Sequence, residues 1–130
     1  MYLDANFFIF SNVTTDARGD RARKILREIV AGKHAVTSVL ALDEVLWVLR
    51  KNKRGGESRP VLEWIYSIPN LEVREAPALI PLRAVDFIEQ HGLRPRDAFH
   101  VAIMEHFSIR EIVTDDADFD NLPGIKRVAL

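Results

Sequence analysis

The chain has 130 residues, of which 48% are hydrophobic, a formal net charge of −1 and no cysteine. This length and hydrophobic content suit one ordinary core, so we expect a single domain over residues 1–130. Without cysteine, disulfides, thiolate metal sites and cysteine nucleophiles are excluded, and any metal must use oxygen or imidazole ligands. No apolar run approaches the ~20 residues of a membrane span, and the apolar first ten residues lack the basic leader of a secretory signal. We therefore expect a cytoplasmic protein with no membrane segment.

Hydrophobic periodicity and helix-capping residues predict alternating strands and helices. In chain order, the predicted strands are 1–3, 34–37, 71–74, 111–114 and 125–129, and the predicted helices are 21–31, 38–51, 58–68, 78–90 and 94–107. Asp16 or Asp20 caps the first helix, Thr37-Ser38 caps the second, and Gly92 ends the fourth. Helices of this length between strands require crossover connections, which predicts an α/β fold with a mostly parallel sheet and helices on both faces.

Carboxylates follow directly after two of the predicted strands. Asp4 comes after the first strand, and the pair Asp115-Asp116 comes after the fourth. Ligands of such sheets bind beyond the carboxyl ends of the strands, so both positions lie where we expect a site. Aspartate is also common in turns and caps, and either position alone fits that role. The strand pattern does not choose between Asp115 and Asp116.

Glu44 lies on a predicted helix that is apolar almost all round. Its neighbours one turn away on the same face are Leu40, Trp47 and Val48. An ionised carboxylate in apolar surroundings is costly unless it is paired or bound to a metal, which makes Glu44 a candidate ligand. A rotation of the helix would bury Asp43 instead, and a partly exposed glutamate at the helix edge is the remaining alternative.

Asp97 lies near the start of a predicted helix, just after Pro95. The positive end of a helix suits both an N-cap aspartate and a metal-binding one, so both roles remain open. His100 follows one turn later. We interpret it as a core or packing histidine rather than a catalytic one, although it lies within reach of the site.

Carboxylates that converge on one concave site repel each other when the site is empty. Divalent Mg²⁺ or Mn²⁺ removes this repulsion, because hard cations prefer oxygen ligands and Mg²⁺ also binds substrate phosphates. Such a site predicts metal-assisted hydrolysis of a phosphodiester without a separate nucleophile.

Four short sequence blocks, in this order, resemble the PIN-domain family, the nuclease fold of VapC-type toxins. The blocks are Tyr2-Leu3-Asp4-Ala5-Asn6, Thr37-Ser38 leading to Glu44, Arg94 to Ala102, and Val113 to Phe119. The resemblance implies a three-layer α/β/α sandwich and an endoribonuclease that hydrolyses RNA phosphodiester bonds with Mg²⁺ or Mn²⁺. It also implies the toxin of a toxin–antitoxin pair, with an antitoxin protein as partner, and a homodimer.

The resemblance assigns roles residue by residue. The acids that match the family's catalytic metal ligands are Asp4, Glu44, Asp97 and Asp116, with Asp118 as an outer contributor. The polar residues that match positions orienting ligands or water are Asn6, Ser38 and Thr114. The T-x-D-x-D-F spacing places Asp116 rather than Asp115 in the site. Ala5 stands where many members have Ser or Thr, so one supporting hydroxyl is missing.

Other readings remain open. Within the same fold, the chain could be an RNA-processing nuclease that is not a toxin, or a catalytically inactive interaction or RNA-binding module. A phosphotransfer domain also has an Asp at a strand end, but the phosphatase pattern needs a second Asp where this chain has Asn6. The basic residues that are candidates for positioning RNA phosphates, or are plain surface charges, are Arg50, Lys51, Lys53, Arg54, Arg94 and Arg96.

Overall fold

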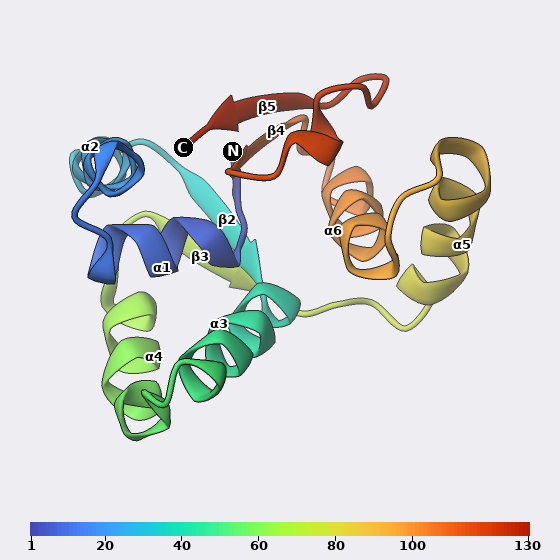
Figure 1. Cartoon of the computed structure of the whole chain (residues 1–130). Coiled ribbons are helices and arrows are strands. Elements are labelled where there is room, and N and C mark those ends of the chain that lie inside the picture. Colours follow the sequence, from blue (N-terminus) through green and yellow to red (C-terminus); the bar gives the residue numbers. More distant parts are fainter.

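The computed structural model describes all 130 residues as five strands and six α-helices (Figure 1). The strands are β1 (Tyr2–Leu3), β2 (Ala35–Ser38), β3 (Leu71–Arg74), β4 (Glu111–Thr114) and β5 (Lys126–Ala129). The helices are α1 (Ala5–Val13), α2 (Ala17–Val30), α3 (Val39–Lys51), α4 (Ser58–Ser67), α5 (Ile80–His91) and α6 (Pro95–His106). Two short 3-10 turns, η1 (Gly55–Glu57) and η2 (Ala117–Phe119), complete the chain. None of the helices is both long and apolar enough to cross a membrane.

The sheet has the strand order β3-β2-β1-β4-β5, and every neighbouring pair is parallel. The predicted mostly parallel sheet is therefore confirmed and is parallel throughout. From β1 the chain adds β2 and β3 on one side, then returns to add β4 and β5 on the other. The order reverses between β1 and β4, and ligands of open α/β sheets bind at the carboxyl ends of strands at such a point.

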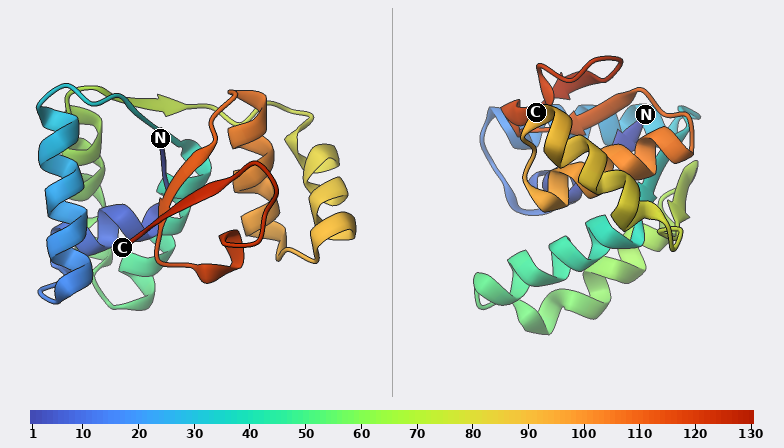
Figure 2. Two further views of the ribbon diagram at one scale, coloured as in Figure 1. Left: turned by 90° about the horizontal axis from the view of Figure 1, so that it is seen from above. Right: turned by 90° about the vertical axis from the view of Figure 1, so that its right-hand side faces the viewer.

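Each face of the sheet is covered by helices, which confirms the three-layer arrangement. Successive strand residues point to opposite faces, so Leu3 joins one core and Tyr2 the other. The first core lies against α1 to α4, and the second lies against α5 and α6 (Figures 1 and 2). Phe7 and Phe8 of α1 are fully buried in the first core, and burial of each such side chain contributes about 1.5–3 kcal/mol.

Helix α1 is missing from the predicted elements. Its sequence ANFFIFSNV is almost uniformly apolar and shows no 3.6-residue period, so periodicity could not identify it. The helix begins at Asp4, whose carboxylate accepts a hydrogen bond from the backbone N–H of Phe7 at 3.2 Å. Helix α2 then begins at Ala17, because Asp16 rather than Asp20 is its cap.

One predicted cap is confirmed in position only, and one of the two roles left open for Asp97 is excluded. Ser38 occupies the N-cap position of α3, but its hydroxyl bonds Tyr2 and makes no capping bond. Helix α6 begins at Pro95 with Arg94 as its N-cap, so Asp97 is not the cap and its carboxylate is free for the site. The predicted end of α5 is confirmed, because Gly92 adopts the left-handed conformation (φ 66°) that terminates helices.

Candidate metal centre

The candidate site lies at the carboxyl edge of the sheet, where β1 and β4 end side by side. Asp4 follows β1 directly, and Asp116 follows β4 after one intervening residue. Ser38 ends β2, the other neighbour of β1. The topology therefore brings together residues that lie more than a hundred positions apart in sequence.

Three carboxylates form the tightest acidic group. Asp97, Asp116 and Asp118 each offer an oxygen, and these oxygens lie within 4.8 Å of one another. A turn after β4 sets two of them, because the backbone N–H of Asp118 donates to the Asp116 carboxylate at 2.9 Å. Burial, followed by the nearby charge of Asp116, raises the pKa of Asp97. One oxygen of Asp97, Oδ2, is buried and has no hydrogen-bond partner.

Arg94 lies over this acidic group. Its guanidinium binds Asp118 at 2.7 Å and lies 3.7 Å from both Asp97 and Asp116. The hydrogen bond to Asp118 and the charges of the other two acids raise the pKa of Arg94. The arginine side chain is 70% exposed, so water screens these ion pairs and weakens their contribution.

Asp4 is buried at the end of β1 and does not belong to the group of three acids whose oxygens lie within 4.8 Å of one another. Its residue is only 7% exposed. Besides capping α1, it accepts a long hydrogen bond from the Asn6 amide at 3.4 Å. Burial raises the pKa of Asp4 to about 6, although the Thr114 hydroxyl, His100 and the Phe7 N–H all act to lower it. Asp4 thus carries a charge that its surroundings only partly compensate.

Glu44 is held by a chain of buried hydrogen bonds. Its carboxylate lies 2.7 Å from Nε2 of His100, whose Nδ1 lies 2.7 Å from the hydroxyl of Tyr2. The Tyr2 hydroxyl in turn lies 2.7 Å from the hydroxyl of Ser38. When Nε2–H donates to Glu44, Nδ1 of the neutral ring accepts from Tyr2, and Tyr2 accepts from Ser38. This chain fixes the orientation of Glu44 at the edge of the site.

The surroundings of Glu44 differ from those expected. One side of the helix faces solvent, because Trp47 is 49% exposed and Asp43 is exposed as well. Glu44, not Asp43, is therefore the acid directed at the site. His100 is 3% exposed, in agreement with a packing histidine, but its contact with Glu44 also joins it to the acidic site.

The structure thus arranges the expected acids in two parts. Asp97, Asp116 and Asp118 form one group, and Asp118 is its exposed member. Asp4 and Glu44 are not members of that group, and the charge of Glu44 is one of the causes that raise the pKa of Asp4. Thr114 links the two parts, since its hydroxyl also accepts a hydrogen bond from the Asp116 N–H at 3.0 Å.

The donor set fits a hard divalent cation. All candidate ligands are carboxylate oxygens, which Mg²⁺ and Mn²⁺ prefer. A buried acceptor without a partner normally costs about 1–3 kcal/mol, and a cation beside Asp97 Oδ2 would remove that cost. The residues present therefore suit a metal between Asp97, Asp116 and Asp118.

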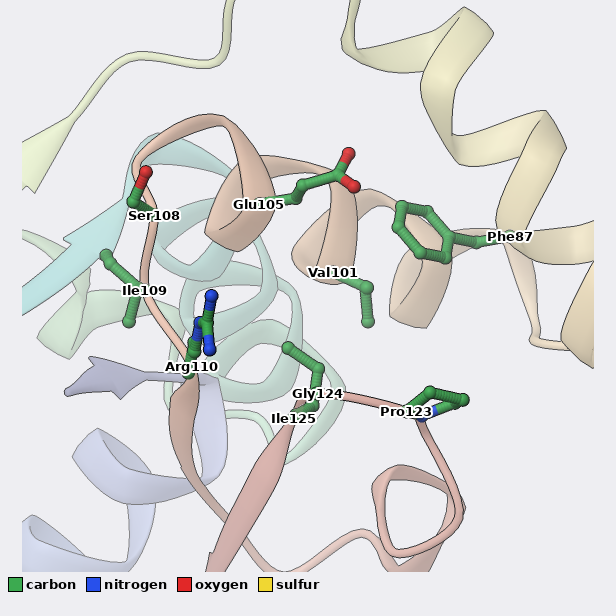
Figure 3. Close-up of a pocket in the computed structure, with 9 residues that line it drawn as sticks. All are labelled: Phe87, Val101, Glu105, Ser108, Ile109, Arg110, Pro123, Gly124 and Ile125. Carbon is green, nitrogen blue, oxygen red and sulfur yellow. The ribbon is translucent and has the colours of Figure 1, made fainter.

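The pocket drawn in Figure 3 is not this site. It has a volume of about 350 Å³ and lies where α5 and α6 meet the segments leading into β4 and β5. Its polar lining comes chiefly from Glu105, Ser108 and Arg110, and none of the candidate acids contributes to it. It therefore lies at the amino ends of the strands, away from the edge where such sheets bind ligands.

The fold and site can be compared with those of known proteins. The PIN domain family matches residues 1–125 of the chain. Ribonuclease VapC13 of Mycobacterium tuberculosis is 26% identical over 117 residues, which cover 85% of this chain and 84% of that protein. This chain belongs to the PIN domain family.

Solved structures have the same fold. A VapBC2 structure from Rickettsia felis, bound to a DNA fragment from its promoter, aligns with a TM-score of 0.76 and 17% identity, over 98% of this chain and 96% of the other. A toxin–antitoxin complex from Klebsiella pneumoniae aligns with a TM-score of 0.67 and 20% identity, over 96% and 94% of the two chains. At this level of identity the likeness establishes the fold alone.

Proposed function

We propose that the protein is an endoribonuclease that hydrolyses RNA phosphodiester bonds with Mg²⁺ or Mn²⁺. The observation that carries the proposal is the group formed by Asp97, Asp116 and Asp118, in which a buried oxygen of Asp97 accepts no hydrogen bond and has only the guanidinium of Arg94 at 3.7 Å. Membership of the PIN domain family and the similarity to a protein named a ribonuclease support the same activity.

In this proposal Asp97 and Asp116 hold the cation, with Asp118 beside them and Asp4 at the buried end of the site. A bound cation would supply an activated water and neutralise charge at the scissile phosphate. Glu44, oriented by His100, accepts a hydrogen bond from a water or from a hydrated ligand at the open side of the site. Asn6 and Thr114 restrict the position of the Asp4 carboxylate.

Arg94 has a double role in the proposal. Without a metal, its guanidinium compensates part of the negative charge of the three acids. A divalent cation held by the three acids would supply the same compensation, and the exposed guanidinium of Arg94 would then be available to an RNA phosphate. Arg96 and the basic end of α3 are further candidates for phosphate contacts.

The activity is tested with end-labelled RNA incubated with the purified protein in MnCl₂ or in EDTA. We expect cleavage in Mn²⁺, none in EDTA, and a loss of about 100-fold or more in rate for Asp97→Asn. Asp43→Asn is the matched control, because Asp43 is an exposed acid one residue from Glu44. Equal cleavage by wild type and Asp97→Asn would show that the activity belongs to a contaminant or to another site. A wild type that binds Mn²⁺ but cleaves no RNA would favour an inactive module.

We also propose that the chain is the toxin of a toxin–antitoxin pair, as the similarity to a toxin–antitoxin complex suggests. Induced expression in a bacterial host is expected to stop growth for wild type and not for Asp97→Asn. Continued growth together with cleavage in vitro would favour an RNA-processing nuclease that is not a toxin. The proposed homodimer is tested separately by sedimentation of the purified protein.

A further inference from the structure

An exposed tryptophan lies next to the acidic site. Trp47 follows Glu44 by one turn on α3, so the two side chains lie on the same side of that helix. The residue is 49% exposed, although indole is among the side chains that gain most from burial. The other tryptophan, Trp64, is partly buried and packs edge-on against Phe8. Trp47 thus leaves an aromatic surface in solvent beside Glu44.

Two cations lie over this indole. Nζ of Lys51, one turn further along α3, is 4.9 Å from the centre of the ring. The guanidinium carbon of Arg96 is 5.7 Å from it and comes from the first turn of α6, directly before Asp97. No carboxylate lies within 4 Å of the charged groups of Lys51 or Arg96, whereas Arg94 is held by Asp118. The two cations therefore keep their charge free for an outside anion.

The arrangement combines a π surface with unpaired positive charge. Single-stranded nucleic acid complements both features, because each nucleotide offers a base face that can stack on the indole and a phosphate that can bind a cation. A double-stranded RNA hides its base faces in the stack, so it could use the cations but not the indole. Two contacts between α3 and α6 place the indole near the site. Glu44 of α3 bonds His100 of α6, and one turn away on both helices Trp47 contacts Arg96.

Resting on the proposed ribonuclease function, we propose that Trp47 is a stacking platform for one unpaired RNA base beside the cleaved bond. Lys51 and Arg96 leave the ring and contact the phosphates that flank this base. The site then selects unpaired RNA, because only a base free of its helix can lie on the indole. Base identity matters little, since every base has a π face.

Binding without cleavage is the direct test. A short fluorescent single-stranded RNA is titrated with the Asp97→Asn protein in Mg²⁺, and its anisotropy is followed. Trp47→Ala in this background is expected to weaken binding about tenfold or more, because one base stack contributes about 1–3 kcal/mol. Trp47→Phe, which keeps an aromatic face, is expected to restore most of the affinity. Tyr66→Ala is the matched control, because Tyr66 is 61% exposed on the neighbouring helix α4.

A second arm separates stacking from a general effect on the surface. The same RNA is prepared with single abasic positions along its length, and one such position is expected to weaken binding by Asp97→Asn but not by the double variant Asp97→Asn/Trp47→Ala. Lys51→Gln and Arg96→Gln are each expected to reduce the slope of log binding constant against log salt concentration by about 1, which corresponds to the loss of one phosphate contact. An equal loss for every abasic position in both proteins would overturn the stacking proposal.

The outcomes also separate this proposal from the proposed function. RNA cleavage by wild type, with binding and cleavage unchanged in Trp47→Ala, would refute the stacking site and leave the ribonuclease intact. If the wild type cleaves no RNA but Trp47→Ala binds RNA tenfold more weakly, the stacking site is supported and the ribonuclease function is refuted. If Trp47→Ala dissociates a dimer and leaves RNA binding unchanged, the indole serves contact between copies of the chain and the proposal fails.

Discussion

Replacing Asp4 with asparagine is expected to stabilise the metal-free protein at neutral pH. Burial raises the pKa of Asp4 to about 6, from an ordinary value of 3.8. The folded protein therefore holds the Asp4 proton more tightly than the unfolded chain does, and stability falls as pH rises between about 4 and 6. Above that range the ionised carboxylate costs about 3 kcal/mol, since each pKa unit corresponds to about 1.4 kcal/mol.

Asparagine removes the charge and keeps the capping bond, and it gives up the long 3.4 Å bond that the Asn6 amide donates to the second Asp4 oxygen. Its side-chain oxygen can accept the bond from the Phe7 N–H that Asp4 accepts at the start of α1, and asparagine is as good an N-cap as aspartate. The variant is therefore expected to be about 3 kcal/mol more stable than wild type near pH 7.5, and only about 1 kcal/mol more stable near pH 4.5.

Urea unfolding in EDTA at the two pH values measures this difference. The ion pairs elsewhere in the chain are the same in both proteins, so their titration cancels in the comparison. Asp43→Asn, at an exposed position, is expected to show no such difference. If Asp4→Asn is less stable than wild type near neutral pH, or if its advantage does not change with pH, the Asp4 carboxylate is not a buried, poorly compensated charge.

Three further substitutions test other parts of the structure. Arg94→Gln is expected to tighten Mn²⁺ binding about two- to fivefold in calorimetric titrations, because an exposed cation that competes for the same carboxylates is removed; weaker binding would mean that Arg94 arranges the ligands instead. Tyr2→Phe removes a buried hydroxyl with two partners and is expected to lower stability to urea by about 1–2 kcal/mol; no change would mean that these bonds give no net stabilisation. Gly19→Ala brings a methyl group within 1.9 Å of a backbone carbonyl oxygen. It is expected to lower stability by about 1–3 kcal/mol, while the unobstructed control Gly56→Ala stays within about 0.5 kcal/mol of wild type; equal stability of the two variants would mean that the backbone near Gly19 moves to admit a methyl group.

Strands β1, β2 and most of β4 were predictable because they are buried on both faces and therefore form short, largely apolar runs. The predicted bounds 71–74 and 111–114 match the structure to the residue. Pro69-Asn70 marks the start of the first, whose residues alternate between apolar and polar, and Asp115 follows the end of the second. Helix α1 was not predicted because an apolar run alone does not indicate which element it forms. It too is apolar throughout, and an apolar run after a short strand carries no period that distinguishes helix from strand.

The candidate site was predictable in its acids and not in its contacts. Strand ends and family-like blocks pointed to Asp4, Asp97 and Asp116 without any knowledge of distances. The bond between Glu44 and His100 joins residues 56 positions apart, and its third member, Tyr2, looks in sequence like an ordinary core residue. Such contacts depend on how α3 and α6 pack around the sheet, and no spacing along the chain encodes that packing. Only the position of His100, one turn after Asp97, offered a signal.

The candidate site holds buried, poorly compensated negative charge in a protein whose other buried polar atoms are almost all hydrogen-bonded. Asp4 and Asp97 both have raised pKa values caused mainly by burial, and Asp97 also leaves an oxygen unpartnered. Across the buried side chains of the whole chain, only one other nitrogen or oxygen atom, in Arg74, lacks a hydrogen-bond partner. A fold selected for stability alone would replace these acids, as Asp4→Asn is expected to show. The concentration of this cost at the carboxyl edge of the sheet is what a cation-binding role explains, because the bound charge would relieve every one of these penalties at once.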